Sequence, residues 1–182
     1  MRRRALLASL SAAATAGCTI GGEPPKPDDL SLTAPDFEDG RIPVRYTCDG
    51  AGDSPPLRVE GVPEPAGSLA VGGEWLYGFS PRTVWLLWRL PPADPLEIPA
   101  GLPDRPRLES PEGAVQGTND EGFVGYRSPC HETPEHDEYR FSLLALEAAP
   151  DVEPGVTRED FDDAVEGLVV SSTSLTATYD RA

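Results

Sequence analysis

Hydrophobic and polar positions alternate along most of this chain in short runs, the pattern typical of half-buried β-strands. Turns rich in proline and glycine separate the runs. The segments predicted as strands are residues 32–37, 42–46, 57–62, 68–71, 83–90, 139–146 and 174–179. The chain is therefore expected to be mainly β.

The run at residues 83–90 (Thr-Val-Trp-Leu-Leu-Trp-Arg-Leu) gives the strongest strand signal. Nearly every position is apolar, which predicts a central strand covered on both faces. Trp85 and Trp88 stand three positions apart, so their side chains should point to opposite faces of that strand. One indole is expected in the core, and the other in a pocket or against a second sheet.

One convincing helix is predicted, beginning after Thr157. Thr157 can cap it, with Asp160 at the third helical position as in a capping box. One face then carries apolar residues at helical spacing: Phe161, Ala164, Val165 and Leu168. The acidic first turns suit the positive end of the helix dipole.

Residues 91–126 break the strand pattern. Residues 91–112 are rich in proline and acidic residues and predict a long excursion, while residues 113–126 are dense in glycine and turns.

The 182 residues include 21 prolines and 18 glycines. This length suits one domain with a substantial core, which we place at residues 31–182.

The first residues have the pattern of an export signal. Three arginines precede a short apolar stretch, so residues 1–17 resemble a twin-arginine signal that ends in a lipoprotein cleavage box at Cys18. Residues 18–30 would then be a lipidated cysteine and a flexible, proline-rich tether. The alternative is an ordinary signal peptide in which Cys18 is incidental.

The chain is strongly acidic, with a formal net charge of −16 and a single lysine among 15 basic residues. Removal of residues 1–17, which hold three arginines and no acid, would make it −19. Dense carboxylates keep a protein hydrated at high salt, so the composition is typical of a halophilic protein. The absence of a basic patch in the sequence argues against nucleic-acid binding.

Two cysteines remain once Cys18 is assigned to the anchor. An oxidising exterior would allow Cys48 and Cys130 to form a disulfide. Two separate buried thiols are equally compatible with the spacing.

Several motifs resemble, in order, the prokaryotic Raf-kinase-inhibitor-like branch of the phosphatidylethanolamine-binding protein (PEBP) family. They are residues 42–50 (Ile-Pro-Val-Arg-Tyr-Thr-Cys-Asp-Gly), 54–57 (Ser-Pro-Pro-Leu), 91–92 (Pro-Pro), 113–120 (Gly-Ala-Val-Gln-Gly-Thr-Asn-Asp), 125–130 (Gly-Tyr-Arg-Ser-Pro-Cys) and 139–146 (Tyr-Arg-Phe-Ser-Leu-Leu-Ala-Leu). The resemblance implies antiparallel β-sheets with one or two short peripheral helices. It also implies a small pocket for an anionic group such as a phosphoryl headgroup.

The chain departs from the family in the segments that resemble the pocket. The family's Asp-Pro-Asp-Ala-Pro is replaced by residues 74–79 (Glu-Trp-Leu-Tyr-Gly-Phe), its His-Trp by Val84-Trp85, and its His-Arg-Tyr by residues 137–139 (Asp-Glu-Tyr). Phosphate sites need donors, and these changes exchange possible cations for carboxylates and aromatic rings. We therefore expect a degenerate anion pocket. Its candidate residues are Glu74, Trp75, Tyr77, Trp85, Tyr126, Asp137 and Tyr139.

Catalytic and metal chemistry find little support. Cys130, His131 and His136 lie close together near carboxylates, but the segment contains a proline and only one such cluster exists, so a rim loop is the preferred interpretation. No Gly-x-Ser-x-Gly elbow occurs. We predict a protein that is not an enzyme and that needs no cofactor.

Two functions remain open. The first is a binding protein for a small ligand or lipid headgroup, held on the extracellular face of the membrane by its N-terminal lipid. The second is an interaction protein that inhibits a secreted protease, because the PEBP family includes inhibitors that dock through the pocket rim. The sequence names neither the ligand nor the oligomeric state.

Overall fold

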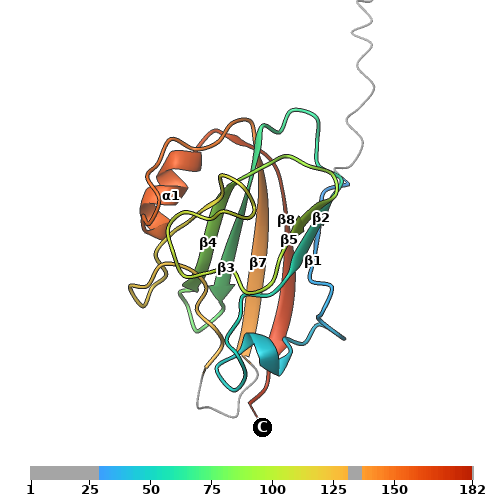
Figure 1. Ribbon diagram of the computed structural model, residues 1–182, viewed down its shortest axis with the longest axis vertical. Coiled ribbons are helices and arrows are strands. Elements are labelled where there is room, and N and C mark those ends of the chain that lie inside the picture. Colours follow the sequence, from blue (N-terminus) through green and yellow to red (C-terminus); the bar gives the residue numbers. More distant parts are fainter. Residues whose placement is uncertain (1–28, 131–136, 182) are drawn as a thin grey trace, which may run out of the picture.

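Two antiparallel β-sheets pack face to face in the computed structural model, which describes residues 29–130 and 137–181 (Figure 1). The small sheet has the order β1-β2-β5, and the large sheet has the order β6-β4-β3-β7-β8. The strands are β1 (Ser31–Thr33), β2 (Leu57–Glu60), β3 (Ser68–Trp75), β4 (Arg82–Leu90), β5 (Leu96–Ile98), β6 (Val115–Gln116), β7 (Asp137–Leu146) and β8 (Val169–Tyr179). The prediction of a mainly β fold is confirmed.

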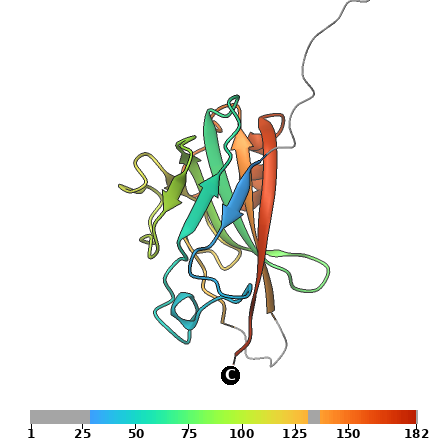
Figure 2. The same ribbon diagram turned by 90° about the vertical axis from the view of Figure 1, so that its right-hand side faces the viewer.

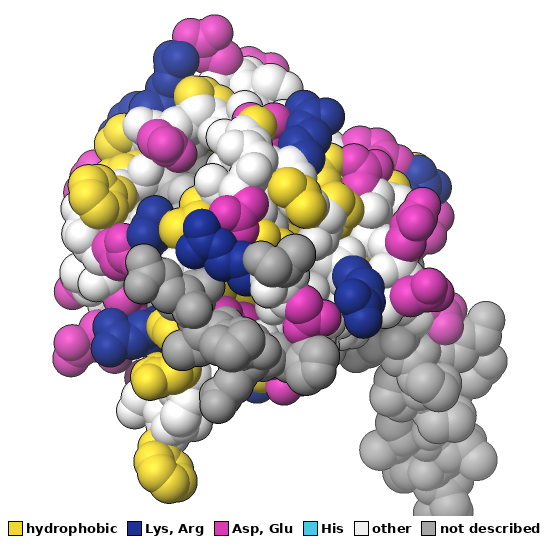
Figure 3. Space-filling model, turned by 90° about the horizontal axis from the view of Figure 1, so that it is seen from below, with side chains coloured by type: hydrophobic (Ala, Val, Ile, Leu, Met, Phe, Trp, Pro, Cys, Tyr) yellow, Lys and Arg dark blue, Asp and Glu magenta, His cyan; other side chains and the backbone are white. Residues whose placement is uncertain are grey.

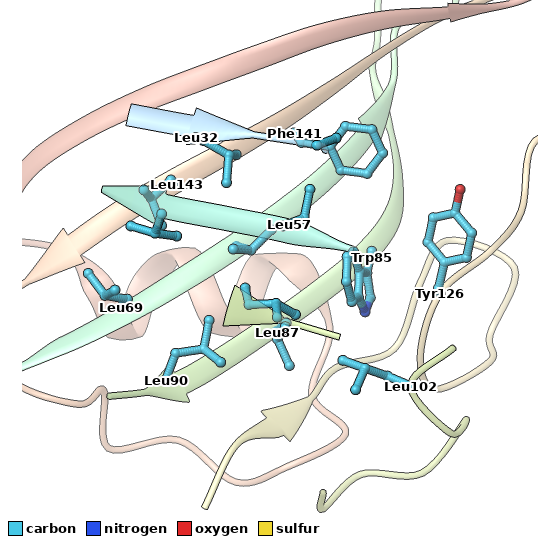
Figure 4. Packing of buried hydrophobic residues seen from close by; sticks show 14 of the residues in the cluster. Leu32, Leu57, Leu69, Trp85, Leu87, Leu90, Leu102, Tyr126, Phe141 and Leu143 are labelled. Carbon is cyan, nitrogen blue, oxygen red and sulfur yellow. The ribbon is translucent and has the colours of Figure 1, made fainter. Parts of the chain in front are cut away.

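The main core fills the space between the two sheets. Leu32 and Leu57 from the small sheet meet Leu69, Phe141 and Leu143 from the large one (Figure 4). All five side chains are buried because alternate positions of each strand point to the same face. This layer fixes the register of both sheets, since a one-residue slip would expose it.

A second core lies on the opposite face of the large sheet, beneath α1 (Arg158–Val165). Trp88 packs there against Phe161, with ring centroids 5.4 Å apart. Trp85 lies in the main core, so the two indoles occupy opposite faces as their spacing predicts. The continuous apolar run of β4 is thus explained by burial on both faces.

The predicted helix start is also confirmed. The Thr157 hydroxyl accepts a hydrogen bond from the Asp160 backbone N–H, and Phe161 and Val165 are buried. No helix among residues 29–130 and 137–181 is long and apolar enough to cross a bilayer.

One strand prediction is wrong, and another is confirmed only in part. Residues 42–46 contain the 3₁₀ turn η1 (Val44–Tyr46), in which the Tyr46 N–H donates to the Pro43 carbonyl. Ile42 and Tyr46 are buried four residues apart, a spacing that a turn satisfies as well as a strand. The strand predicted at 32–37 ends at Thr33, because Pro35 has no N–H to donate to a ladder.

Residues 91–126 contain two short strands that the sequence pattern did not reveal. β5 completes the small sheet against β2, and β6 pairs with β4 at the edge of the large sheet. Each is only two or three residues long, which is too short for an alternating pattern to be visible. These residues therefore close the sandwich at one side.

Candidate functional site

A small pocket lies at the end of the large sheet where β3 ends and β4 and β7 begin. This end of the sheet is the lower one in Figure 1. The volume of the pocket is 230 Å³, somewhat below the usual range of about 300–1,000 Å³ for ligand pockets, so only a small ligand would fit. Side chains from the sheet and from the loops at 120–121 and 127–130 form the wall. The lining residues are Trp75, Tyr77, Arg82, Thr83, Val84, Asp120, Glu121, Arg127, Ser128, Cys130 and Tyr139.

Tyr139 lies at the buried side of this pocket. Its side chain is 1% exposed, and its hydroxyl has no hydrogen-bond partner among the described residues. Burial raises the pKa of Tyr139, and the neighbouring Asp137 charge adds to the rise, while Arg127 opposes it. The hydroxyl is therefore a protonated donor at neutral pH. Buried donors are nearly always satisfied, so this hydroxyl calls for an acceptor other than the described residues, which a ligand in the pocket could supply.

An aromatic wall flanks the tyrosine. The rings of Trp75 and Tyr77 are stacked, with centroids 4.4 Å apart and an interplanar angle of 26°. The Trp75 indole N–H donates to Asp137 at 3.1 Å, which fixes the orientation of the ring. Stacked rings offer an apolar surface that can also receive a cation.

Charges of both signs line the mouth. Arg127 pairs with Glu121 at 2.7 Å, and the Asp120 carboxylate accepts the Thr83 backbone N–H at 2.9 Å. No side-chain partner of Arg82 is found among the described residues. Figure 3 views this end of the molecule and shows basic, acidic and hydrophobic side chains side by side. The formal charge of the lining is balanced, with two arginines against two carboxylates.

The wall at residues 127–130 is held by three links. The Arg127 backbone N–H donates to the Val84 carbonyl at 2.7 Å, and the Cys48 N–H donates to the Pro129 carbonyl at 3.0 Å. Cys48 and Cys130 form a disulfide, with their Cα atoms 5.2 Å apart. Of the two alternatives open from the sequence, the disulfide is the one observed. It ties a pocket wall to the loop that follows η1.

Of the seven residues predicted for the pocket, only Trp75, Tyr77 and Tyr139 line it. Glu74 lies on the opposite face of the sheet, where it forms ion pairs with Arg140 and Arg158. Glu74 directly precedes Trp75 in β3, and adjacent strand residues point to opposite faces. The prediction that Glu74 faces the pocket is therefore wrong.

The other three candidates lie behind or beside the pocket. Asp137 is 8% exposed and supports Trp75, whereas Trp85 is fully buried and donates its indole N–H to Gln116 at 2.8 Å. The Tyr126 hydroxyl donates to the Tyr46 carbonyl, and its ring contacts Trp85 edge-on (Figure 4). These side chains shape the core under the pocket. The carboxylates expected to reverse the charge of the pocket do not line it.

The arginines are the residues that the sequence analysis missed. Arg82 lies three positions after the 74–79 stretch, and Arg127 lies within the 125–130 motif, but neither was assigned to the pocket. Strand parity offered a signal: Arg82 lies opposite Trp75 in the β3–β4 ladder, so the two share a sheet face. The donors lost from the family motifs are thus partly replaced from other positions.

Some predictions lie outside the described residues. They are the export signal at 1–17, the lipidation site Cys18, most of the tether, and the histidines His131 and His136. Among the residues that the structure does describe, no group of three or more His, Cys, Asp or Glu side chains could hold a metal ion.

Comparisons with known proteins give a consistent result. The family model for phosphatidylethanolamine-binding proteins matches residues 33–180. A UPF0098 protein of Methanothermobacter thermautotrophicus is 43% identical over 84% of this chain and 99% of its own length. One of Pyrococcus abyssi is 36% identical over 91% of each chain.

Solved structures agree with this match. A Chlamydia trachomatis structure described as a phosphatidylethanolamine-binding protein homologue superposes with a TM-score of 0.74 at 30% identity, covering 86% of this chain and all of that one. Escherichia coli YbcL also reaches 0.74, at 21% identity, over 84% and 99% of the two chains. The latter likeness concerns the fold alone. The fold predicted from the sequence motifs is confirmed.

Proposed function

This chain belongs to the phosphatidylethanolamine-binding protein family, and we propose that it is a binding protein, not an enzyme, for a small zwitterionic or anionic ligand. The buried Tyr139 hydroxyl supports this proposal most directly, because it is a donor without a partner among the described residues. A phosphoryl or carboxylate oxygen of a ligand would accept that hydrogen bond.

The surrounding charges narrow the class of ligand. Arg82 and Arg127 supply donors for an anionic group, whereas Asp120 and Glu121 balance their charge. Such a lining suits a ligand that carries both signs better than a multiply charged anion. The stacked rings of Trp75 and Tyr77 would receive its apolar or cationic part. Phosphoethanolamine has this combination of groups.

Calorimetric titration at constant salt tests the proposal. Phosphoethanolamine should bind more tightly than inorganic phosphate, and Arg82→Gln should weaken its binding by about tenfold, because a charge-assisted hydrogen bond is lost. Arg58→Gln is the matched control, since Arg58 lies on the small sheet and pairs with Glu60 and Glu97. Absence of binding of both probes, together with no co-purified small molecule in native mass spectrometry, would refute it.

We also propose that the protein is exported and lipid-anchored, on the strength of the arginines, the apolar stretch and Cys18 in its first residues. In native cells the Cys18→Ala variant should move from the membrane fraction to the medium. Finding the unaltered protein in the cytoplasm would contradict export.

Inhibition of a secreted protease is the second candidate function. The loop between β3 and β4 favours it, because Phe79 is fully exposed there and Tyr77 is 58% exposed. Exposed aromatic side chains at a pocket rim are typical anchors for a protein partner. Loss of activity of a secreted protease from the same cells on addition of the protein would support this function. Unchanged activity over a full titration would exclude that protease.

A further inference from the structure

The strand β8 is an unusually open edge of the large sheet. It runs for 11 residues along one side of the molecule (red in Figure 2) and pairs only with β7 in the sheet order of the described residues. The other sheet edges are β1, β5 and β6, which are two or three residues long. Short edges limit unwanted pairing, whereas long ones are templates for another strand.

Backbone groups along β8 point away from the molecule. Thr178 shows the direction: its N–H donates to Gly40 and its carbonyl accepts from Ile42, each at 2.8 Å. Because the hydrogen-bonding direction repeats every two residues, Ser172, Ser174 and Thr176 present their N–H and C=O groups to the same side. No segment within residues 29–130 and 137–181 bonds to these groups. The side chains of all three are exposed.

The composition of β8 differs from that of the rest of the chain. A quarter of the residues in the protein are charged, yet β8 (Val-Val-Ser-Ser-Thr-Ser-Leu-Thr-Ala-Thr-Tyr) has no charge and no proline. Charges and prolines are the usual means of protecting an edge strand. Two copies of a chain with net charge −16 can approach most easily where neither carries a carboxylate.

From these features we propose that β8 is a homodimer interface, in which two copies pair antiparallel about a two-fold axis at Ser174. The large sheets would then join into one continuous sheet. A strand that pairs with itself antiparallel forms a closed, self-complementary contact. In this register Ser174 lies opposite Ser174 of the second copy, and Ser172 lies opposite Thr176. The three residues that would pair, Ser172, Ser174 and Thr176, all carry a hydroxyl, which can form cross-strand hydrogen bonds.

Other occupants fit the edge less well. The N-terminal segment before β1 contains Pro24, Pro25 and Pro27, which have no N–H for a ladder. A bound peptide would need pockets for its alternate side chains, and five pockets found on the described residues have no β8 residue in their walls. The antiparallel arrangement also places the two ligand pockets at opposite ends, so both stay open.

Sedimentation of the full chain tests the interface. Dimerisation should strengthen as salt rises from about 0.1 M to about 2 M, because salt screens repulsion between the acidic copies. Ser174→Lys should raise the dissociation constant more than about tenfold, because it brings like charges together on the two-fold axis. Ser174→Thr keeps the hydroxyl and should change it by less than about threefold. An oligomer held by the N-terminal residues would respond to neither variant, and that result would overturn the proposal.

Cross-linking tests the register independently. In a Cys18→Ser background, Ser174→Cys should form a disulfide-linked dimer under mild oxidation, because the two positions meet at the axis. Ser172→Cys should cross-link poorly alone and efficiently when combined with Thr176→Cys. A monomer at all salt concentrations would overturn the proposal. So would a monomer whose β8 amides resist hydrogen exchange, since another segment or a peptide would then cover the edge.

Discussion

Replacing Tyr139 by phenylalanine removes one oxygen atom from the pocket and leaves the ring in place. The Tyr139 hydroxyl is buried and has no partner among the described residues, so in the ligand-free protein its desolvation is not offset. Burying an unpaired hydroxyl costs about 1–3 kcal/mol in protein mutational data. Tyr139→Phe should therefore raise the free energy of unfolding by about 1–2 kcal/mol, with no cavity formed.

Tyr126→Phe is the matched control. Tyr126 is equally a core tyrosine, but its hydroxyl donates to the Tyr46 carbonyl at 3.1 Å and it does not line the pocket. Its loss should lower the free energy of unfolding by about 1–2 kcal/mol, because a buried carbonyl loses its donor. Two nearly identical substitutions should thus have opposite effects on stability.

Urea unfolding followed by tryptophan fluorescence measures both effects, provided that the protein is first refolded from denaturant to remove any bound ligand. The slope with denaturant should be unchanged, so that the midpoints report stability directly. The affinity for ligand should respond only to the substitution in the pocket. Tyr139→Phe should weaken phosphoethanolamine binding by about tenfold, and Tyr126→Phe should leave it unchanged. If Tyr139→Phe destabilises the ligand-free protein as much as Tyr126→Phe, the interpretation of an unpaired donor is refuted.

Three further predictions concern the scaffold. Glu74→Gln should lower stability by about 1–2 kcal/mol in the same unfolding assay, because Arg140 and Arg158 lose a shared, partly buried carboxylate. Glu97→Gln is the control: Glu97 forms an exposed ion pair with Arg58, so its loss should cost less than about 0.5 kcal/mol. Reduction of the Cys48–Cys130 disulfide should lower stability by about 2–4 kcal/mol and weaken phosphoethanolamine binding. Equal affinity of the reduced and oxidised protein would show that the disulfide does not shape the pocket. Burial and the Asp36 hydrogen bond raise the pKa of Tyr46 to about 12, so stability should be full below pH 10 and fall as the pH rises toward 12; Tyr46→Phe should lose less over that range.

Long or fully buried elements were predictable from the sequence, because their patterns are strong. β4 shows a continuous apolar run, β7 a regular alternation, and α1 a cap followed by helical spacing. η1, β5 and β6 were not predictable, since two or three residues carry no periodicity and are defined by the partners they meet.

The pocket could be predicted only in part. Its aromatic residues Trp75 and Tyr77 replace family motifs at the matching positions, so the resemblance located them. The arginines come from Arg82 and from the loop at Arg127, where only the folded chain brings them beside Tyr139. The charge of the pocket was therefore predicted from the family's missing histidines and arginine alone, whereas the arginines that supply donors come from other positions in the chain.

The bridge from Cys48 to Cys130 spans 82 positions and encloses the whole β3–β4 hairpin, including its protruding tip at Phe79. A protease that cleaves this tip would leave two polypeptides still covalently joined. The clipped protein would migrate as one species in non-reducing electrophoresis and as two after thiol treatment. On the extracellular face of the membrane that we propose for this protein, such a cut would leave the two parts of the fold linked.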